Sequence, residues 1–246
     1  MIWIIGGTKD SRNIIDRLGN SGIIVSTATE YGKKLLKGLN VVSEPMDQGE
    51  MREFIRSKRV DLVLDASHPY AINVSQNAIE ASKAEGIDYI RFEREMLTYE
   101  EGVKFSSMDE LTKCLKSLKG NILVTLGSNN LNYFKGMCNL ENIYFRILPV
   151  KASLEKAEKA GILPKQIIAV QGPFSKDFNK AIYKNYEINY VVTKESGATG
   201  GELEKIEAAA DCGVKPVILS RPEIDYPWKT GDIDQIIKKV MEYEEA

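Results

Sequence analysis

Residues 188–202 read INYVVTKESGATGGE, and this stretch decides the fold. The apolar, β-branched run 188–192 has the composition of a buried strand, and the segment from Glu202 onward has that of a helix. The loop between them carries glycines, hydroxyl side chains and a Lys-Glu pair. Because the first N–H groups of a helix have no partner within the helix, such a loop is typical of a site for a carboxylate or phosphate.

A second strand–glycine–helix turn stands at the start of the chain, in residues 2–10, IWIIGGTKD. Two interpretations of Gly6-Gly7-Thr8 stay open. The turn contacts the pyrophosphate of a dinucleotide, or it is a tight turn in which Thr8 caps the next helix. The full G-x-G-x-x-G fingerprint is absent, and Glu30 comes only after the second strand has ended, so the sequence does not separate NAD from NADP.

Short β-branched runs alternate with amphipathic segments along the chain, which is typical of parallel sheets covered by helices on both faces. The expected strands are 2–5, 23–27, 41–43, 61–65, 88–92, 103–106, 121–126, 143–147, 166–171, 188–192 and 215–220. The expected helices are 10–20, 31–37, 49–57, 73–85, 109–118, 202–213 and 232–244. The pattern predicts an α/β protein with two Rossmann-like, doubly wound domains, 1–97 and 98–246. It leaves open which domain the last helix packs on.

Composition excludes several classes of protein. Among 246 residues, 33 Lys and Arg face 35 Asp and Glu, so the formal charge of -2 offers no broad field for nucleic acid. Three widely spaced cysteines favour a reducing cytoplasm over a disulfide framework, and one histidine rules out a multi-histidine zinc site, so no metal is expected. No apolar run approaches the roughly 20 residues that span a bilayer, and the oligomeric state stays unknown.

Residues 65–71, DASHPYA, follow the fourth expected strand and therefore lie at the carboxyl edge of the first sheet. Doubly wound folds bind their ligands at this edge. The only histidine, His68, has two interpretations. It donates a proton or hydrogen bond to a ligand, or it is a loop residue beside the helix that Pro69 helps to start.

Basic side chains stand at several other expected strand ends, among them Arg91, Arg94, Lys194 and Arg221. If these side chains converge in the fold, they would bind several carboxylates of a ligand. The alternative is that each one pairs with an acidic neighbour. Glu195 follows Lys194 directly, and the two are either an acid–base pair or an exposed ion pair.

These motifs together resemble the family of precorrin-6A reductases and cobalt-precorrin-6A reductases of cobalamin biosynthesis. The most specific pair is D-A-[ST]-H-P-[FY]-A with T-K-[DE]-S-G-x-x-G-G, and the likeness covers nearly the whole chain. It implies an oxidoreductase that transfers a hydride from NADPH or NADH to one double bond of the tetrapyrrole (cobalt-)precorrin-6A. It also implies two Rossmann-like domains with a cleft between them, where cofactor and substrate meet.

The motifs and strand ends predict the following site residues. Cofactor contacts are expected at Gly6, Gly7, Thr8, Thr29, Ser67, His68 and Pro69. Substrate contacts are expected at Arg91, Arg94, Lys194, Ser196, Gly197, Gly200 and Gly201. The candidates for proton delivery are His68, Tyr31, Glu195 and bound solvent.

Two other functions stay open. One is an NAD(P)-dependent reductase or epimerase of a small anionic metabolite, which would bind no tetrapyrrole. The other is a non-enzymatic, dinucleotide-sensing module, for which the first domain would suffice and loop 194–201 would have no explanation.

Overall fold

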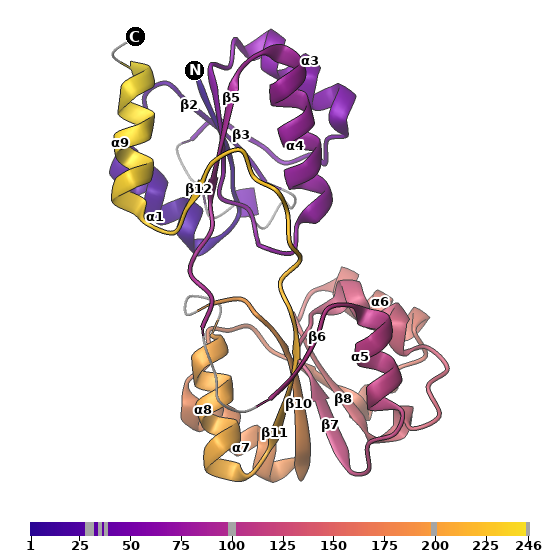
Figure 1. Cartoon of the computed structure of the whole chain (residues 1–246). Helices are drawn as coiled ribbons and strands as arrows, with labels where there is room; N and C mark the ends of the chain where they lie inside the picture. Colours follow the sequence, from indigo (N-terminus) through magenta and orange to yellow (C-terminus); the bar gives the residue numbers. More distant parts are fainter. Residues whose placement is uncertain (28–31, 34–35, 37–38, 98–101, 198–200, 245–246) are drawn as a thin grey trace. The chain divides into compact units, whose positions relative to one another are not determined.

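The computed structural model describes residues 1–27, 32–33, 36, 39–97, 102–197 and 201–244. The chain divides into two compact units, one formed by Met1–Glu95 with Pro222–Ala246 and the other by Met96–Arg221 (Figure 1). The predicted second domain, 98–246, differs from this division at its end, because the C-terminal segment pairs and packs within the first unit.

The first unit contains one parallel sheet, which has six strands within the described residues. The strands are β1 (Ile2–Ile5), β2 (Ile23–Ser26), β3 (Val41–Val42), β4 (Leu62–Asp65), β5 (Asp88–Phe92) and β12 (Lys229–Thr230). The helices are α1 (Lys9–Leu18), α3 (Gln48–Lys58), α4 (Ile72–Glu85) and α9 (Ile233–Glu244). The strand order is β12-β5-β4-β1-β2-β3.

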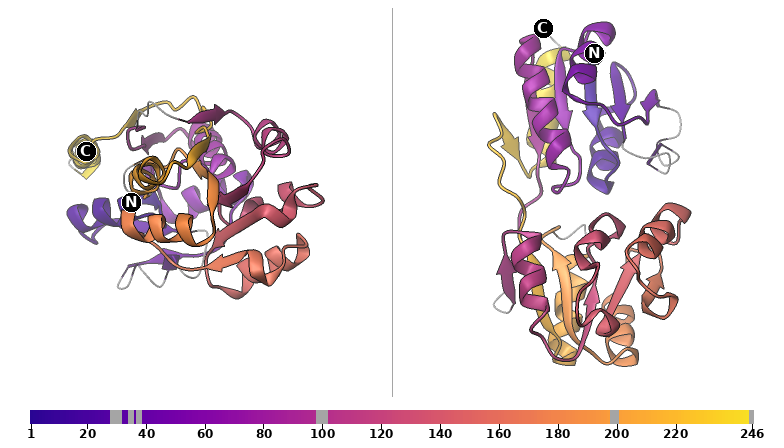
Figure 2. Two further views of the ribbon diagram at one scale, coloured as in Figure 1. Left: turned by 90° about the horizontal axis from the view of Figure 1, so that it is seen from below. Right: turned by 90° about the vertical axis from the view of Figure 1, so that its right-hand side faces the viewer.

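Strand β1 shows why this sheet needs helices on both faces. Its four residues are buried, and alternate side chains point to opposite sides. Ile2 and Ile4 belong to the core under α1 and α9, whereas Trp3 and Ile5 belong to the core under α3 and α4. Figure 2 shows the resulting helix–sheet–helix layers of each unit from two further directions.

The second unit repeats this architecture with another parallel sheet, again of six strands within the described residues. The strands are β6 (Val103–Phe105), β7 (Asn121–Val124), β8 (Ile143–Ile147), β9 (Ile167–Ala169), β10 (Ile188–Lys194) and β11 (Lys215–Leu219). The α-helices are α5 (Met108–Leu115), α6 (Lys151–Lys159), α7 (Lys176–Asn185) and α8 (Glu202–Cys212). Short 3-10 helices cover Ser128–Phe134, Leu140–Asn142 and Pro164–Gln166. The order is β6-β11-β10-β7-β8-β9.

Each sheet has a point at which the winding direction reverses. In the first unit the chain proceeds from β1 outward through β2 and β3, and then from β4 outward in the opposite direction. The reversal falls between β1 and β4, and in the second unit it falls between β7 and β10. Ligands of doubly wound sheets bind at the carboxyl ends of the strands at such a point. The predicted α/β class with two doubly wound sheets is confirmed.

The C-terminal segment completes the first unit. Strand β12 pairs with β5 in parallel, with Lys229 beside Arg91 and Thr230 beside Phe92. Helix α9 packs next to α1 and buries Ile236 and Val240 in the core (Figure 1). Within the described ranges, none of the helices combines the length and apolar character that crossing a bilayer requires.

Candidate functional site

The turn after β1 is held by a reciprocal cap. The Thr8 hydroxyl accepts the Ser11 N–H at 3.0 Å, and the Ser11 hydroxyl accepts the N–H groups of Gly7 and Thr8, each at 3.1 Å. The Thr8 hydroxyl also donates to the Ala66 carbonyl at 2.8 Å. Thr8 thus joins the loops after β1 and β4 across the winding reversal. The capping interpretation of Thr8 holds, and it leaves room for the cofactor interpretation of the glycines.

The turn requires glycine at positions 6 and 7 for two different physical reasons. A Cβ on Gly6 would lie 3.1 Å from the Ser11 hydroxyl and 3.3 Å from Val25, so the turn packs tightly there. Gly7 has φ +101°, a conformation that L side chains rarely adopt, and a Cβ there would meet only Thr27 atoms, 3.9 Å or more away. The backbone at Gly7 is therefore open to a ligand, next to the N-terminus of α1.

His68 lies in the loop that follows β4. Its side chain is exposed, whereas Ser67 and Pro69 on either side are buried. The Nδ1 atom accepts the Tyr70 N–H at 3.2 Å, so the neutral imidazole carries its proton on Nε2. An exposed, neutral ring whose donor nitrogen is fixed in this way can donate a hydrogen bond at the carboxyl edge of the sheet. To deliver a proton, the ring would first have to take one up at Nδ1 and give up the bond from Tyr70.

A buried ion pair lies directly beneath this loop. Asp65 and Arg91 are neighbours in register on β4 and β5, and both are 0% exposed. The guanidinium donates to the Asp65 carboxylate at 2.8 Å and to the Ser67 hydroxyl at 3.1 Å. The same carboxylate accepts the Tyr89 and Ser75 hydroxyls, each at 2.6 Å. Arg91 therefore fixes Ser67, and its predicted contact with substrate stays a prediction.

The charge of Asp65 is stabilised by these partners. Burial alone raises the pKa of a carboxyl group, but Arg91 and the hydroxyls of Ser75 and Tyr89 outweigh it, so the pKa of Asp65 lies below its usual value. Burial and the nearby Asp65 carboxylate raise the pKa of Tyr89. The loop after β4 thus stands on a carboxylate that stays ionised.

Arg94 pairs with Asp10, an acidic residue in the first turn of α1. This contact places Arg94 beside α1, the helix that follows the Gly6-Gly7-Thr8 turn. Three predicted site residues, Thr29, Tyr31 and Gly200, lie outside the described residues.

The loop after β10 is built around left-handed glycines. Gly197 has φ +72° and Gly201, the N-cap of α8, has φ +66°. The Ser196 N–H donates to the Lys194 carbonyl at 2.9 Å, which makes a tight turn, and burial lowers the pKa of Lys194. The described part of this loop brings the predicted Lys194, Ser196 and Gly197 together at the carboxyl edge of the second sheet.

Glu195 is buried and holds neighbouring segments. Its carboxylate accepts Lys104 Nζ at 2.6 Å and the Arg221 N–H at 2.9 Å. The carboxylate pairs with Lys104, which lies on β6, and the predicted pairing with Lys194 stays a prediction. The carboxylate thus links β10 to the segment after β11, and its catalytic role stays a prediction.

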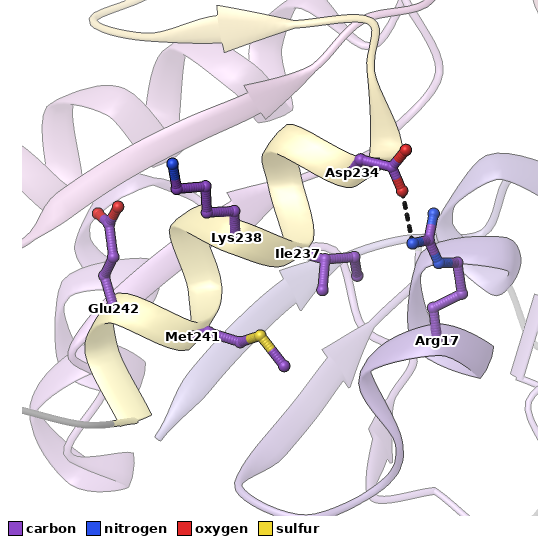
Figure 3. Close-up of a pocket in the computed structure, with 6 residues that line it drawn as sticks. All are labelled: Arg17, Asp234, Ile237, Lys238, Met241 and Glu242. Carbon is purple, nitrogen blue, oxygen red and sulfur yellow. Dashed lines mark hydrogen bonds and ion pairs between the residues drawn. The ribbon is translucent and has the colours of Figure 1, made fainter.

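A shallow pocket lies elsewhere in the first unit, between α1 and α9 (Figure 3). Arg17 donates to Asp234 across it. The lining residues are Arg17, Asp234, Ile237, Lys238, Met241 and Glu242. None of these belongs to the predicted site, so this pocket is separate from the strand-end loops.

Two doubly wound sheets, each with a glycine-bearing turn at its winding reversal, define a protein of the Rossmann type, a class whose members commonly bind nucleotide-like or anionic ligands at such turns. The family model "Precorrin-6x reductase CbiJ/CobK" matches residues 1–241. The chain belongs to this family and is a reductase of cobalamin biosynthesis.

Individual relatives agree with this assignment. A "Cobalt-precorrin-6A reductase" of Methanocaldococcus jannaschii is 36% identical over 97% of each chain. A protein of the same name from Priestia megaterium is 32% identical over 98% of each. The solved structure "CobK precorrin-6A reductase" superposes with a TM-score of 0.81 over 98% of this chain and 96% of that one, and its 18% identity speaks for the fold alone.

Proposed function

We propose that this chain is an NAD(P)H-dependent reductase of precorrin-6A or cobalt-precorrin-6A. The reduced nucleotide gives a hydride to one atom of a double bond in the macrocycle, and a proton is added to the other atom. The observation that carries the proposal is the glycine-bearing turn at the winding reversal of each sheet, because the reaction needs sites for two anionic molecules.

The first unit fits the nucleotide. Its turn exposes the Gly7 backbone beside the first N–H groups of α1, which suit a pyrophosphate. Thr8 and Ser11 hold the turn in this shape without a ligand. When bound, a nicotinamide supplies the hydride; the protein orients it, excludes water and delivers the proton.

The second unit suits the substrate, a macrocycle with acetate and propionate groups. Burial lowers the pKa of Lys194, and a substrate carboxylate within a few ångströms would favour its charged form. The left-handed glycines Gly197 and Gly201 let a backbone approach a ligand closely. We assign the tetrapyrrole to this loop on these grounds.

We place the reaction in the cytoplasm. Cys114, Cys138 and Cys212 all lie in the described ranges and none forms a disulfide. Thiols in this state fit a reducing compartment, in which NADH and NADPH are also available.

The proposal is tested by anaerobic turnover of precorrin-6A and cobalt-precorrin-6A, with NADH and NADPH in parallel. Oxidation of nucleotide matched by loss of the visible bands of the substrate is the expected result, and the four combinations identify the preferred pair. Tight nucleotide binding without any turnover of either tetrapyrrole would contradict it and favour a small-metabolite enzyme or a sensing module.

Gly7→Ala is expected to weaken nucleotide binding about tenfold or more, because the new methyl group occupies the open side of the turn and disfavours φ +101°. Titration of NADPH and NADH by nucleotide fluorescence measures the effect. The matched control is Gly19→Ala at the other end of α1, where φ is +80° and no atom lies within 4 Å of the new Cβ. Equal affinities for the two variants would refute the assignment of the turn.

A further inference from the structure

Helix α8 starts without the device that starts several other helices of this chain. Thr8, Asp47, Ser107 and Ser175 cap α1, α3, α5 and α7 through side-chain hydrogen bonds. The N-cap of α8 is Gly201, which makes no side-chain bond. The described part of the loop, residues 195–197, must therefore be held against α8 by other contacts.

The first residue of α8 supplies one such contact. The Glu202 carboxylate reaches back and accepts the Gly197 N–H at 2.7 Å, and Glu202 is only 1% exposed. A carboxylate in the first turn of a helix is also stabilised by the helix dipole. Its second oxygen, Oε1, is buried with no hydrogen-bond partner in the described part of the chain. Burying this charge is costly, which indicates that its single bond to Gly197 matters.

One turn further along α8, Lys205 holds the end of β10, from which the loop departs. Its Nζ donates to the Thr193 hydroxyl at 2.6 Å, and Thr193 is 0% exposed. Glu202 and Lys205 are three residues apart, so they lie on one face of the helix. Lys205 therefore binds Thr193 at the end of β10, and Glu202 binds Gly197, the first left-handed glycine after it.

We propose that Glu202 and Lys205 are positioning residues that hold residues 193–197 in the shape that binds the tetrapyrrole. The inference rests on the proposed function in assigning the substrate to this loop. Neither residue touches the substrate. Both act through Thr193 and Gly197, so their loss weakens substrate binding and leaves the hydride step intact.

The first test follows the loop without any substrate. Hydrogen exchange of the Gly197 amide is expected to be about tenfold faster in Glu202→Ala, because the bond to the carboxylate is lost. Glu202→Gln keeps an acceptor without the charge and is expected to fall between this variant and the wild type. The control is Glu207→Ala, because Glu207 is an exposed residue of the same helix. In this variant the Gly197 amide is expected to exchange at the wild-type rate. Unchanged exchange in Glu202→Ala would overturn the proposal, whatever the enzyme reduces.

The second test is a double-mutant cycle on the enzyme reaction. Lys205→Met and Thr193→Val are each expected to raise the KM for the tetrapyrrole about tenfold, with kcat within about twofold and the nucleotide KM unchanged. The double variant is expected to be no worse than either single one, because both remove the same bond.

Lys205→Met is expected to fold. Burial, together with nearby Arg146 and Lys194, lowers the pKa of Lys205 to about 7, so the variant removes a disfavoured buried charge. Additive rises in KM, or a fall in kcat with KM unchanged, would refute positioning by Lys205. A wild-type enzyme that fails to reduce either tetrapyrrole would instead refute the proposed function, and the exchange test would still decide the role of Glu202.

Discussion

Arg91→Met is expected to lower the free energy of unfolding of the first unit by about 3 to 5 kcal/mol, because it leaves the Asp65 carboxylate buried without its ion-pair partner. Both tryptophans of the chain, Trp3 and Trp228, belong to this unit, so their fluorescence in a urea titration reports on its unfolding. Arg91→Lys keeps the positive charge but loses the several N–H donors of the guanidinium. Its free energy of unfolding is expected to lie between those of the wild type and Arg91→Met.

The matched control is Arg17→Met, because Arg17 pairs with Asp234 on the surface, where the two side chains are 48% and 77% exposed. Its loss is expected to cost less than about 1 kcal/mol. A loss for Arg91→Met as small as this would refute the structural role of the pair.

Lowering the pH is expected to reduce the difference in the free energy of unfolding between the wild type and Arg91→Met. In the wild type the lowered pKa of Asp65 contributes stability that is fully present above the ordinary carboxyl range, so this contribution is the same at pH 7 and pH 5 and is lost only at lower pH. In the variant burial raises the pKa of Asp65, so protonation on acidification relieves the buried charge. Urea titrations at pH 7 and pH 5 measure the difference, and a constant gap would show that Asp65 is not the group responsible.

His68→Ala is expected to lower kcat by about a hundredfold or more, the range typical of a lost proton donor. Within the described residues His68 is the candidate with an exposed ring, which can take up a proton from solvent and pass it to the substrate. Glu195 instead uses its carboxylate to accept Lys104 and the Arg221 N–H, which suits a charged, structural group. Single-turnover reduction of the tetrapyrrole with saturating nucleotide measures the effect on the chemical step.

His68→Gln separates proton transfer from binding. A glutamine amide donates hydrogen bonds but does not deliver a proton at neutral pH, so kcat is expected to fall as in His68→Ala while both KM values stay near wild type. Turnover of His68→Ala at the wild-type rate would remove His68 from the candidates and leave Tyr31, Glu195 or bound solvent.

Most strands were predictable because they are β-branched runs between turn residues. The predicted bounds of β1, β5 and β8 agree with the structure. Helix α6 was missed, since Val150 precedes it and offers no capping bond. Strand β12 was missed because a Lys-Thr pair has little strand character of its own and is extended only by pairing with β5.

The loops at the carboxyl ends of the strands were predictable, whereas the contacts that their side chains make were not. Their roles in binding and catalysis stay predictions. Glycines and hydroxyls after strand ends indicated the turns after β1, β4 and β10. The inward direction of Arg91 depends on its register beside Asp65, which a single strand does not reveal. The contacts of Glu202 and Lys205 with Gly197 and Thr193 depend on the tertiary structure, which the sequence does not show. The spacing of three residues, which places both side chains on one face of a helix, is the signal that could have indicated them.

The return of the C-terminal segment to the first sheet has a consequence for synthesis on the ribosome. Met96–Arg221 is continuous in sequence and can fold as soon as it has emerged, whereas the N-terminal part must wait for residues 222–246. Until then the outer edge of β5 has no neighbour, and the core that α1 shares with the sheet lacks Ile236 and Val240 of α9. An exposed strand edge promotes aggregation, so nascent chains that stop short of Pro222 are the ones most in need of a chaperone.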